Sequence, residues 1–370
     1  MKLTLNDFKW YGRNLDYNGI KYFDYSASGF EFCFTGKKAA CTIYSDSPNY
    51  DEANKGVVGV YVTELSSAAE YKGASYWENF PEDLCQRIIL KDEKTEAVLF
   101  ESTEEKTVLI RVLKISEVNF GSAGIKEVEI DGKQNLPTAA ASTAMKVEII
   151  GDSITCGYGI EGVYNVDGFK TSQERADKAY GFLTMKALGA EFQECCWSGI
   201  GIISKYVDPS VNVPDTSVVM PSIWPYTDKS LSLRLGLEPE VWNESKFSPD
   251  LVILHLGTND ASYVRDVEER RLAYVSGVRQ FLEAIHRRSP KARLLVCLGV
   301  MGESLCDSQA EAVKLFSQDF KNVPVKVVRF PVQDEEKEGV AADWHPKAET
   351  HQRVARQLVD AIKNWTVNIT

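Results

Sequence analysis

Three polar clusters in the second half of the chain hold the side chains that hydrolytic chemistry needs. Gly151-Asp152-Ser153 provides a serine, Gly257-Thr258-Asn259-Asp260 an amide, and Asp343-Trp344-His345 a histidine. A serine hydroxyl attacks a carbonyl carbon when a base accepts its proton and when hydrogen-bond donors stabilise the oxyanion that develops. The three clusters therefore indicate nucleophilic acyl transfer, if the fold brings them to one place.

The chain has four histidines, so the base can be sought by elimination. His255 lies inside an apolar run, where a satisfied core histidine is expected. His286 stands beside Arg287-Arg288 near a helix end, where a solvated side chain favours the helix dipole. His351 lies in or just before the last helical pattern, with no strand end beneath it. His345, at a loop-to-helix junction, is the predicted base.

Alternating strands and helices are expected to position these clusters. Apolar runs predict strands at Val147–Ile150, Leu251–Leu256, Leu294–Leu298 and Val325–Phe330. Helical periodicity predicts helices at Ala176–Leu188, Val267–Arg287, Gln309–Phe320 and Ala348–Trp365. This alternation predicts a parallel sheet with helices on both faces. Because ligands of such sheets bind beyond the carboxyl ends of the strands, the three clusters are expected to meet at that edge.

The first third of the chain has a different pattern. Phe30, Phe32 and Phe34 alternate with less apolar residues. Five further segments are short and β-branched or aromatic: Val57–Val62, Arg87–Leu90, Ala97–Phe100, Thr107–Ile115 and Lys126–Ile130. Residues 1–135 are therefore predicted to form an all-β sandwich of the jelly-roll type. Pro137 and small residues predict a linker at 136–145, ahead of an α/β domain at 146–370.

The charge composition of the chain limits the classes of partner that it is expected to bind. Lys plus Arg number 42 and Asp plus Glu 53, so the net charge is −11. A chain this acidic gains no general attraction to nucleic acid or to an anionic membrane. No apolar run is long enough to span a bilayer, and the first residues lack a signal-peptide pattern, so a cytoplasmic location is expected, or a secreted one if this chain is a mature form. The eight cysteines include no CxxC pair, and neither a metal site nor a disulfide framework is expected.

The ordered motifs resemble those of the SGNH (GDSL-type) hydrolases. Gly151-Asp152-Ser153, Gly199, Gly257-Thr258-Asn259-Asp260 and a late histidine occur in the order of that family. The longer stretches around them, with Asp343-Trp344-His345-Pro346, are similar to family two of the carbohydrate esterases, which carries a jelly roll ahead of its SGNH domain. The resemblance implies a serine esterase that removes acetyl groups from plant-cell-wall carbohydrate, such as acetylated xylan or glucomannan, without a metal or organic cofactor.

The resemblance also implies residue roles. Ser153 is the nucleophile and His345 the base, and the oxyanion hole uses the backbone N–H groups of Ser153 and Gly199 and the side-chain amide of Asn259. The broader pattern has an aspartate three residues before the histidine, where this chain has Ala342. The imidazole is then oriented either by the carboxylate of Asp343 or by a backbone carbonyl in a Ser–His dyad, and the dyad is favoured.

Several alternatives stay open or are set aside. Trp344, next to the base, is expected to touch substrate, whereas Asp152 is expected to shape its turn and Asp260 to brace the Asn259 loop.

The same fold also serves general acyl esterases, thioesterases and acyltransferases, and a non-catalytic carbohydrate-binding protein is a further alternative. The stretch 157–162 spells GxGxxG, but it does not directly follow a strand, so a dinucleotide site is not predicted.

Overall fold

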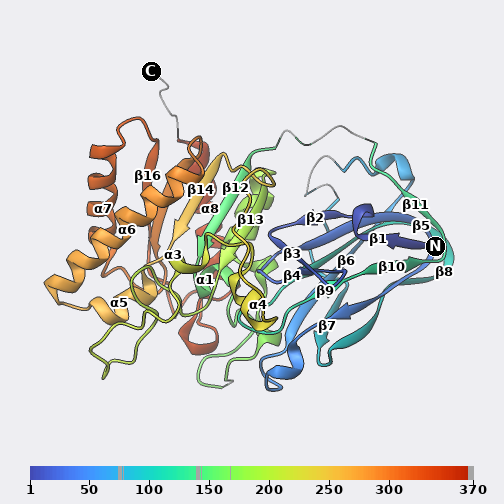
Figure 1. The fold of residues 1–370 in the computed structure, drawn as a ribbon, viewed down its shortest axis with the longest axis horizontal. Coiled ribbons are helices and arrows are strands. Elements are labelled where there is room, and N and C mark those ends of the chain that lie inside the picture. The colour runs from blue at the N-terminus through green and yellow to red at the C-terminus, as the bar shows by residue number, and fades with distance from the viewer. Residues whose placement is uncertain (74–76, 78, 139–141, 143, 167, 366–370) are drawn as a thin grey trace.

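The chain folds into an antiparallel β domain and a parallel α/β domain that lie side by side (Figure 1). The computed structural model describes all residues except 74–76, 78, 139–141, 143, 167 and 366–370. The predicted fold class is confirmed. The linker predicted at 136–145 includes residues 139–141 and 143, which lie outside the described residues, so the predicted domain boundaries stay a prediction.

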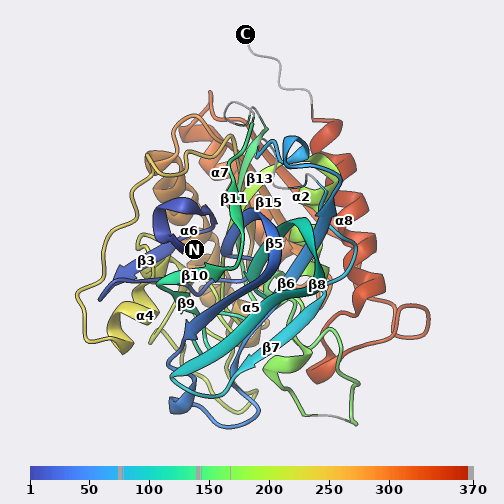
Figure 2. The ribbon, with the colours of Figure 1, turned by 90° about the vertical axis from the view of Figure 1, so that its right-hand side faces the viewer.

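The β domain is one curled sheet of eleven strands. The strands are β1 (Lys2–Thr4), β2 (Lys9–Tyr11), β3 (Asn14–Tyr17), β4 (Ile20–Phe23), β5 (Gly29–Tyr44), β6 (Gly56–Leu65), β7 (Gln86–Leu90), β8 (Lys94–Lys114), β9 (Gly124–Ile125), β10 (Glu127–Ile130) and β11 (Lys133–Asn135). The main path runs β3-β4-β9-β5-β8-β6-β7, and Figure 2 faces its long central strands.

Two long strands join the halves of this sheet. The segments predicted as separate strands at Ala97–Phe100 and Thr107–Ile115 belong to the single 21-residue strand β8, except for Ile115, which follows it. Its pairing with β5 shifts register between Gly36 and Lys38 and again between Ala39 and Ala40. Such bulges bend a strand without ending it, so β5 and β8 stay paired on both sides of the two register shifts.

The α/β domain has a five-stranded parallel sheet in the order β13-β12-β14-β15-β16. These strands are β12 (Lys146–Gly151), β13 (Glu191–Cys196), β14 (Leu251–His255), β15 (Arg293–Gly299) and β16 (Val325–Phe330). The α-helices are α1 (Ser153–Cys156), α2 (Tyr180–Leu188), α3 (Met220–Ile223), α4 (Lys229–Arg234), α5 (Thr258–Val264), α6 (Glu268–Arg288), α7 (Cys306–Asp319) and α8 (Ala348–Lys363). Single-turn 3-10 helices lie at Leu5–Asp7, Ser47–Asn49, Ala68–Glu70, Thr171–Gln173, Ala176–Lys178 and Ala342–Trp344.

Each face of the parallel sheet buries its own core. Val147 and Ile149 of β12 pack in one cluster with α2 and α8, whereas Ile150 packs in the other with α6 and α7. Neighbouring residues of a strand point to opposite faces, so a strand covered on both sides is mostly apolar, as the buried residues of β12 are apart from Glu148. Strand β13 was not predicted because it breaks this rule: it buries Gln193 and Glu194 inside the segment EFQECC.

Two arginines join the two domains, Arg13 buried and Arg234 half-buried. Arg13 of the β domain donates to Glu148 of β12 at 2.8 Å and to the carbonyls of Trp224 and Tyr226 at 2.5 Å each. Arg234 of α4 pairs in return with Asp24 of the β domain at 2.7 Å. Removing one partner of a buried ion pair leaves an uncompensated charge, so these contacts favour one fixed arrangement of the domains.

The expectations about membrane spans and about the cysteines concern the whole chain. In the part that the structure describes, no helix combines the length and the apolar character that crossing a bilayer requires. All eight cysteines are free thiols, and seven of them are buried. The seven buried ones therefore pack as small apolar side chains.

Candidate active site

Ser153 lies two residues after the end of strand β12, which is second in the sheet order. Asp152 is the N-cap of α1, and its carboxylate accepts the N–H of Ile154 at 3.0 Å. This agrees with the structural role predicted for Asp152. Gly151 permits the tight turn, because a Cβ there would lie 1.9 Å from the hydroxyl oxygen of Thr155. Strand, cap and short helix together hold the Ser153 hydroxyl at the carboxyl edge of the sheet.

His345 meets Ser153 across 192 residues of chain. Its Nε2 lies 2.8 Å from Ser153 Oγ, within normal hydrogen-bond distance. The loop that carries it is held on both sides, since the His345 N–H donates to the Ala342 carbonyl at 3.0 Å and the His345 carbonyl accepts from Ala341 at 2.8 Å. The structure therefore brings the predicted nucleophile and the predicted base together.

The second imidazole nitrogen faces a backbone carbonyl. His345 Nδ1 lies 3.2 Å from the carbonyl oxygen of Asp343, whereas the Asp343 carboxylate accepts the hydroxyl of Tyr158 at 2.8 Å. Asp343 and Trp344 both have left-handed backbone, with φ of +50° and +62°. This conformation costs about 1–2 kcal/mol per non-glycine residue, and here it turns the Asp343 carbonyl toward the ring.

Tyr158 packs against the imidazole and was not identified from the sequence. Its ring centroid lies 4.2 Å from that of His345, and on its other side it stacks on Phe169 at 3.8 Å. The glycine-rich stretch 157–162 explains this contact. A Cβ at Gly159 would lie 2.8 Å from the Cβ of Ala342, so the glycine lets this stretch approach the histidine loop closely. A GxGxxG pattern without a preceding strand was the available signal.

Oxyanion stabilisation has candidate donors at this edge. Among the described residues, no acceptor is found for the N–H of Ser153 or for the N–H of Gly199. The Asn259 side chain, at the start of α5, donates one N–H to the Ile200 carbonyl at 2.8 Å. An amide carries two such hydrogens, so one is left for a ligand. The roles of Gly199 and Asn259 stay predictions.

Asp260 holds a different loop from the one expected. Its buried carboxylate accepts the backbone N–H groups of Ile202, Ile203 and Ser204 at 2.7 to 3.2 Å. The prediction that Asp260 braces the Asn259 loop was therefore wrong, because its carboxylate binds the loop after Gly199. The physical reason is that three N–H groups of the chain after Gly199 point inward and need a buried acceptor.

The remaining histidines have structural surroundings. His255 is fully buried against Tyr180 and Phe330, but neither of its ring nitrogens has a hydrogen-bond partner among the described residues, so the expectation of a satisfied histidine was wrong. His351 is also buried, and its Nδ1 accepts the N–H of Tyr180 at the first residue of α2. His286 packs on Phe316 and Phe320 rather than standing free in solvent.

Trp344 is half-buried beside the base. Its indole N–H donates to the carboxylate of Glu335, and its carbonyl accepts the side chain of Gln333 at 2.7 Å. These contacts fix the loop that presents His345. A contact between Trp344 and substrate stays a prediction.

The site lowers the basicity of its histidine and raises that of its carboxylates. Burial lowers the pKa of His345 to about 4, and the nearby Asp343 raises it only in part. Burial raises the pKa of Asp152 to about 7 and that of Asp260 to about 6. The imidazole is therefore neutral over the whole physiological range, the form that accepts a proton from serine.

The pH profile should follow this lowered pKa. A base acts only in its neutral form, so kcat/KM for a small acetate ester should stay level from pH 8 to about pH 5 and fall below that, with a midpoint at about 4. The groups facing the ring are Ser153, Tyr158, Asp343 and, through its charge, His351. Near-ultraviolet circular dichroism at each pH separates loss of activity from unfolding. A midpoint at pH 6.5, the ordinary value, would contradict the prediction.

A serine in contact with a histidine at the carboxyl edge of a parallel sheet defines an α/β domain of the serine-hydrolase type. Residues 149–353 match the model of the GDSL-like Lipase/Acylhydrolase family. This match covers more than half of the chain, and the chain belongs to that family.

Two curated relatives share extended similarity. "Cellulase/esterase CelE" of Acetivibrio thermocellus is 32% identical over 238 residues, which are 63% of this chain and 27% of the relative. "Acetylxylan esterase / glucomannan deacetylase" of Cellvibrio japonicus is 28% identical over 255 residues, 69% of this chain and 66% of the relative. The chain thus spans about a quarter of the first relative's length and just under two thirds of the second's.

Solved structures share both domains. A family two carbohydrate esterase from Clostridium thermocellum in complex with cellohexaose has a TM-score of 0.77 at 26% identity, with 96% of this chain and 98% of that chain covered. An acetyl xylan esterase (Est2A) from the rumen bacterium Butyrivibrio proteoclasticus has a TM-score of 0.81 at 20% identity, with 98% of each chain covered. This similarity extends over the β domain as well as the α/β domain.

Proposed function

We propose that this protein is a serine carbohydrate esterase that removes O-acetyl groups from plant-cell-wall polysaccharides or oligosaccharides, such as acetylated xylan or glucomannan. The observation that supports it most directly is the 2.8 Å contact between Ser153 Oγ and His345 Nε2, together with the backbone N–H groups of Ser153 and Gly199, for which the described residues provide no acceptor. The curated relatives support the substrate class, since one of them is an acetylxylan esterase and glucomannan deacetylase.

Acylation begins when Ser153 Oγ attacks the acetyl carbonyl carbon and its proton passes to His345 Nε2. The carbonyl π electrons move to oxygen, and the N–H groups of Ser153 and Gly199 and the amide of Asn259 stabilise the resulting oxyanion. Loss of one such donor typically costs ~10²–10³ in kcat. When the tetrahedral intermediate collapses, His345 returns the proton to the departing sugar oxygen, and the sugar hydroxyl is released from acetyl-Ser153.

Deacylation repeats the sequence with water. His345 accepts a proton from a water molecule, whose oxygen attacks the acetyl carbon. Collapse then expels Ser153 Oγ, which regains its proton from His345, and acetic acid leaves as acetate. In both halves the ring becomes an imidazolium, and its Nδ1–H donates to the Asp343 carbonyl. A partial negative charge on that carbonyl orients the ring without a carboxylate.

Acetate release tests this function. The substrates are acetylated xylan, acetylated glucomannan and a small aryl acetate, with the Ser153→Ala variant as the control. Release from the polysaccharides that depends on Ser153 supports the proposal and ranks the sugars. Activity on the aryl acetate alone would instead favour a general acyl esterase, a thioesterase or an acyltransferase. Inactivity of the folded protein on all three would overturn the proposal in favour of the carbohydrate-binding alternative.

The cytoplasmic location expected from the sequence is part of the same proposal. It predicts that the enzyme acts on short acetylated oligosaccharides that have entered the cell. Fractionation of cells that express the natural gene tests it, because the protein should then be found in the lysate. Recovery of most of the protein from the culture medium would contradict this location.

A further inference from the structure

A carboxylate of the β domain contacts the loop that bears Gly199. Glu117 lies between β8 and β9, and its Oε2 accepts the N–H of Ser198 at 2.6 Å. Ser198 directly precedes Gly199, so this hydrogen bond fixes the peptide unit next to the predicted oxyanion donor. Glu117 is fully buried.

Other buried groups hold Glu117 in place. The Lys114 ammonium donates to the Glu117 carbonyl at 3.0 Å and to the Asp24 carboxylate at 3.2 Å. From the α/β domain, the Glu174 carboxylate accepts the N–H of Glu117 at 3.0 Å. All four of these side chains are buried. Because rotation of any one would leave a buried polar group unpaired, the cluster has little freedom to move.

The loop is thus held at both ends by carboxylates. Glu117 binds its first part at Ser198, and Asp260 binds its later part at Ile202, Ile203 and Ser204. Gly199 lies between the two anchors with φ of +77° and an N–H that has no acceptor among the described residues. A donor acts on an oxyanion when it is fixed before the reaction, so both anchors bear on the rate.

We propose that Glu117 is a positioning residue of the esterase site: by holding the Ser198 N–H, it fixes the Gly199 N–H toward the developing oxyanion. The inference rests on the proposed function. It gives the β domain a part in the reaction, since the acceptor comes from the first domain and the donor it positions from the second. Burial also raises the pKa of both Glu117 and Glu174, which favours a shared proton over two neighbouring charges.

Three variants test this role with an aryl acetate. Glu117→Ala removes the acceptor, Glu117→Gln keeps an oxygen for the Ser198 N–H, and Glu194→Ala is the control. Glu194 is likewise a buried carboxyl, on β13, but neither of its oxygens has a hydrogen-bond partner among the described residues. We expect Glu117→Ala to lower kcat about 10- to 100-fold with KM within about twofold, while Glu117→Gln and Glu194→Ala keep kcat within about threefold.

Two results would overturn the role of Glu117. One is an unchanged kcat in folded Glu117→Ala. The other is an equal loss in Glu117→Ala and Glu117→Gln, which would point to charge rather than to the acceptor. If Glu117→Ala does not fold, Glu174→Ala removes the brace alone, and an unchanged kcat there would equally contradict the proposal. If the wild-type protein hydrolyses no ester, the result contradicts the proposed function and not the role of Glu117. In that case, the rate at which a phosphonate probe labels Ser153 in the variants still tests the positioning.

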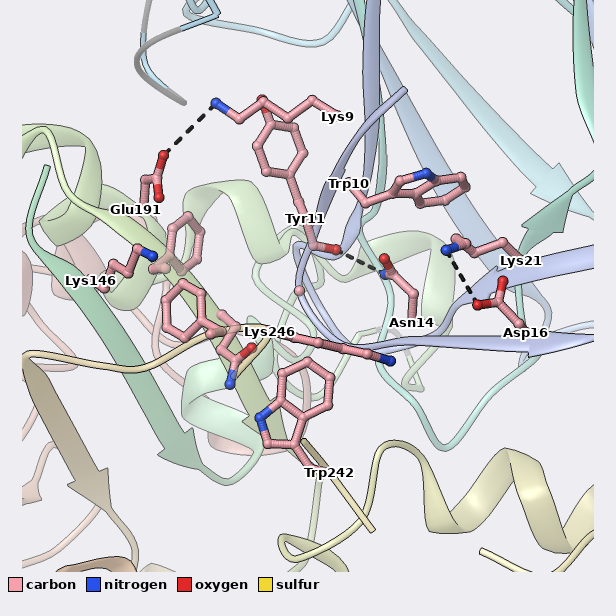
Figure 3. Close-up of a pocket in the computed structure, with 14 residues that line it drawn as sticks. Lys9, Trp10, Tyr11, Asn14, Asp16, Lys21, Lys146, Glu191, Trp242 and Lys246 are labelled. Atoms are coloured by element: carbon pink, nitrogen blue, oxygen red, sulfur yellow. Dashed lines mark hydrogen bonds and ion pairs between the residues drawn. The ribbon is translucent and has the colours of Figure 1, made fainter. Parts of the chain in front are cut away.

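A separate cavity supports a second inference. It has a volume of about 320 Å³ and lies where the two domains meet (Figure 3). Its lining includes Lys146, the first residue of β12, whereas Ser153 follows the last residue of that strand. Five steps of about 3.3 Å separate the two ends of β12 by roughly 17 Å. The cavity is therefore at the edge of the sheet opposite to the esterase site.

The cavity is cationic although the chain is acidic overall. Its lining has four lysines and two carboxylates. The carboxylates are already engaged, Glu191 with Lys9 at 3.9 Å and Asp16 with Lys21 at 3.3 Å. Lys146 and Lys246 have no carboxylate within ion-pair distance in the part of the chain that is described. Instead, they stand 5.8 Å from the Phe247 ring and 5.9 Å from the Trp242 ring.

Aromatic rings form the walls of this cavity. Trp10, Trp242 and Phe247 line it together with the polar side chains of Asn14 and Gln193, and Figure 3 shows Lys246 beside Trp242. Flat apolar rings suit the C–H faces of a pyranose, amides suit its hydroxyls, and an unpaired ammonium suits a carboxylate. A volume of about 320 Å³ lies at the lower end of small-molecule sites, which suits one or two sugar units.

The geometry points to a binding site for a uronic acid unit of a glycan, distinct from the esterase site. Lys146 and Lys246 are assigned to the carboxylate and the half-buried Trp10 to the sugar face, because the Trp242 ring is buried with Arg13 packed on it. This inference does not depend on catalysis, so it can be tested by binding alone in Ser153→Ala as well as in wild type. Its success or failure is then independent of the proposed function.

Titration calorimetry at low salt tests the site. The probes are a xylo-oligosaccharide with one glucuronic acid, the same oligosaccharide without it, and glucose 6-phosphate. We expect the acidic oligosaccharide to bind at least tenfold more tightly than the neutral one, and Lys146→Gln/Lys246→Gln to abolish that preference. Equal binding of the two oligosaccharides, or no binding at millimolar concentration, would overturn the site. Preference for the phosphate would overturn the assignment to a carboxylate. Lys91→Gln, which changes a lysine outside this cavity, is the control.

Discussion

Replacing Ser153 with alanine is expected to lower kcat/KM for acetate release by at least about 10⁴-fold. The hydroxyl oxygen, 2.8 Å from His345 Nε2, is the nucleophile of the proposed reaction, and alanine leaves nothing to form the acetyl intermediate. Removal of a serine nucleophile from a comparable constellation costs ~10⁶ in kcat, while the remaining oxyanion donors retain some rate over water. The measurement is acetate release from the best substrate of the wild type.

The fold should survive this substitution. Ser153 lies at the start of α1 after a cap formed by Asp152, so the hydroxyl is not needed to begin the helix. We expect the thermal midpoint to stay within about 2 °C. Ser276→Ala, at an exposed position on α6, is the matched control and should keep full activity. A Ser153→Ala variant with more than about a tenth of wild-type activity would exclude Ser153 as the nucleophile.

Replacing His345 with alanine should have the second largest effect, a loss of about 10³–10⁴-fold in kcat at pH 7. A positioned general base is worth ~10²–10⁴-fold, and no other imidazole reaches Ser153: His255 is buried against Tyr180, and the Nδ1 of His351 accepts the N–H of Tyr180. The variant should also lose the acid limb of the pH profile, because the group that titrates is gone. The measurement is kcat against pH for both proteins.

Asp343→Asn is the matched control for His345. The Asp343 carboxylate faces Tyr158, and the group that faces His345 Nδ1 is the backbone carbonyl, which the substitution keeps. We therefore expect less than about a fivefold fall in kcat, whereas loss of a triad carboxylate costs ~10⁴-fold. A loss of that size in folded Asp343→Asn would show that the carboxylate, rather than the carbonyl, orients the imidazole.

The orientation of Asp343 shows where local sequence reasoning stops. The sequence shows an aspartate two residues before His345 but not which oxygen faces the ring. The left-handed backbone at Asp343 and Trp344 decides this, and it is held by contacts from distant residues, among them Gln333 and Tyr158. Strained backbone persists only when its surroundings hold it, so no pattern in the loop itself predicts it.

The sequence analysis missed strand β13 and assigned Asp260 to the wrong loop for a related reason. Periodicity finds strands by their apolar residues, and β13 buries Gln193 and Glu194 where apolar residues are expected. Asp260 was assigned to its own loop because local hydrogen bonds are the usual role of an aspartate in a turn. Its actual partners, Ile202 to Ser204, are more than fifty residues away.

The sequence by itself determined the fold class, the order of most strands and helices and the candidate residues, because these depend on local periodicity and on residue types that few reactions need. Apolar runs and helical spacing are properties of neighbouring residues. Ser153 and His345 were identified as candidates because acyl transfer needs a nucleophile and a base. Tertiary structure alone decided which groups meet: the Asp343 carbonyl with His345, Glu117 with Ser198, and the lysines with the aromatic rings of the cavity. Glu117 and Ser198 lie 81 residues apart, and even the two-residue contact of Asp343 with His345 depends on a backbone conformation held by the rest of the fold, so packing between whole elements sets their geometry and local pattern does not encode it.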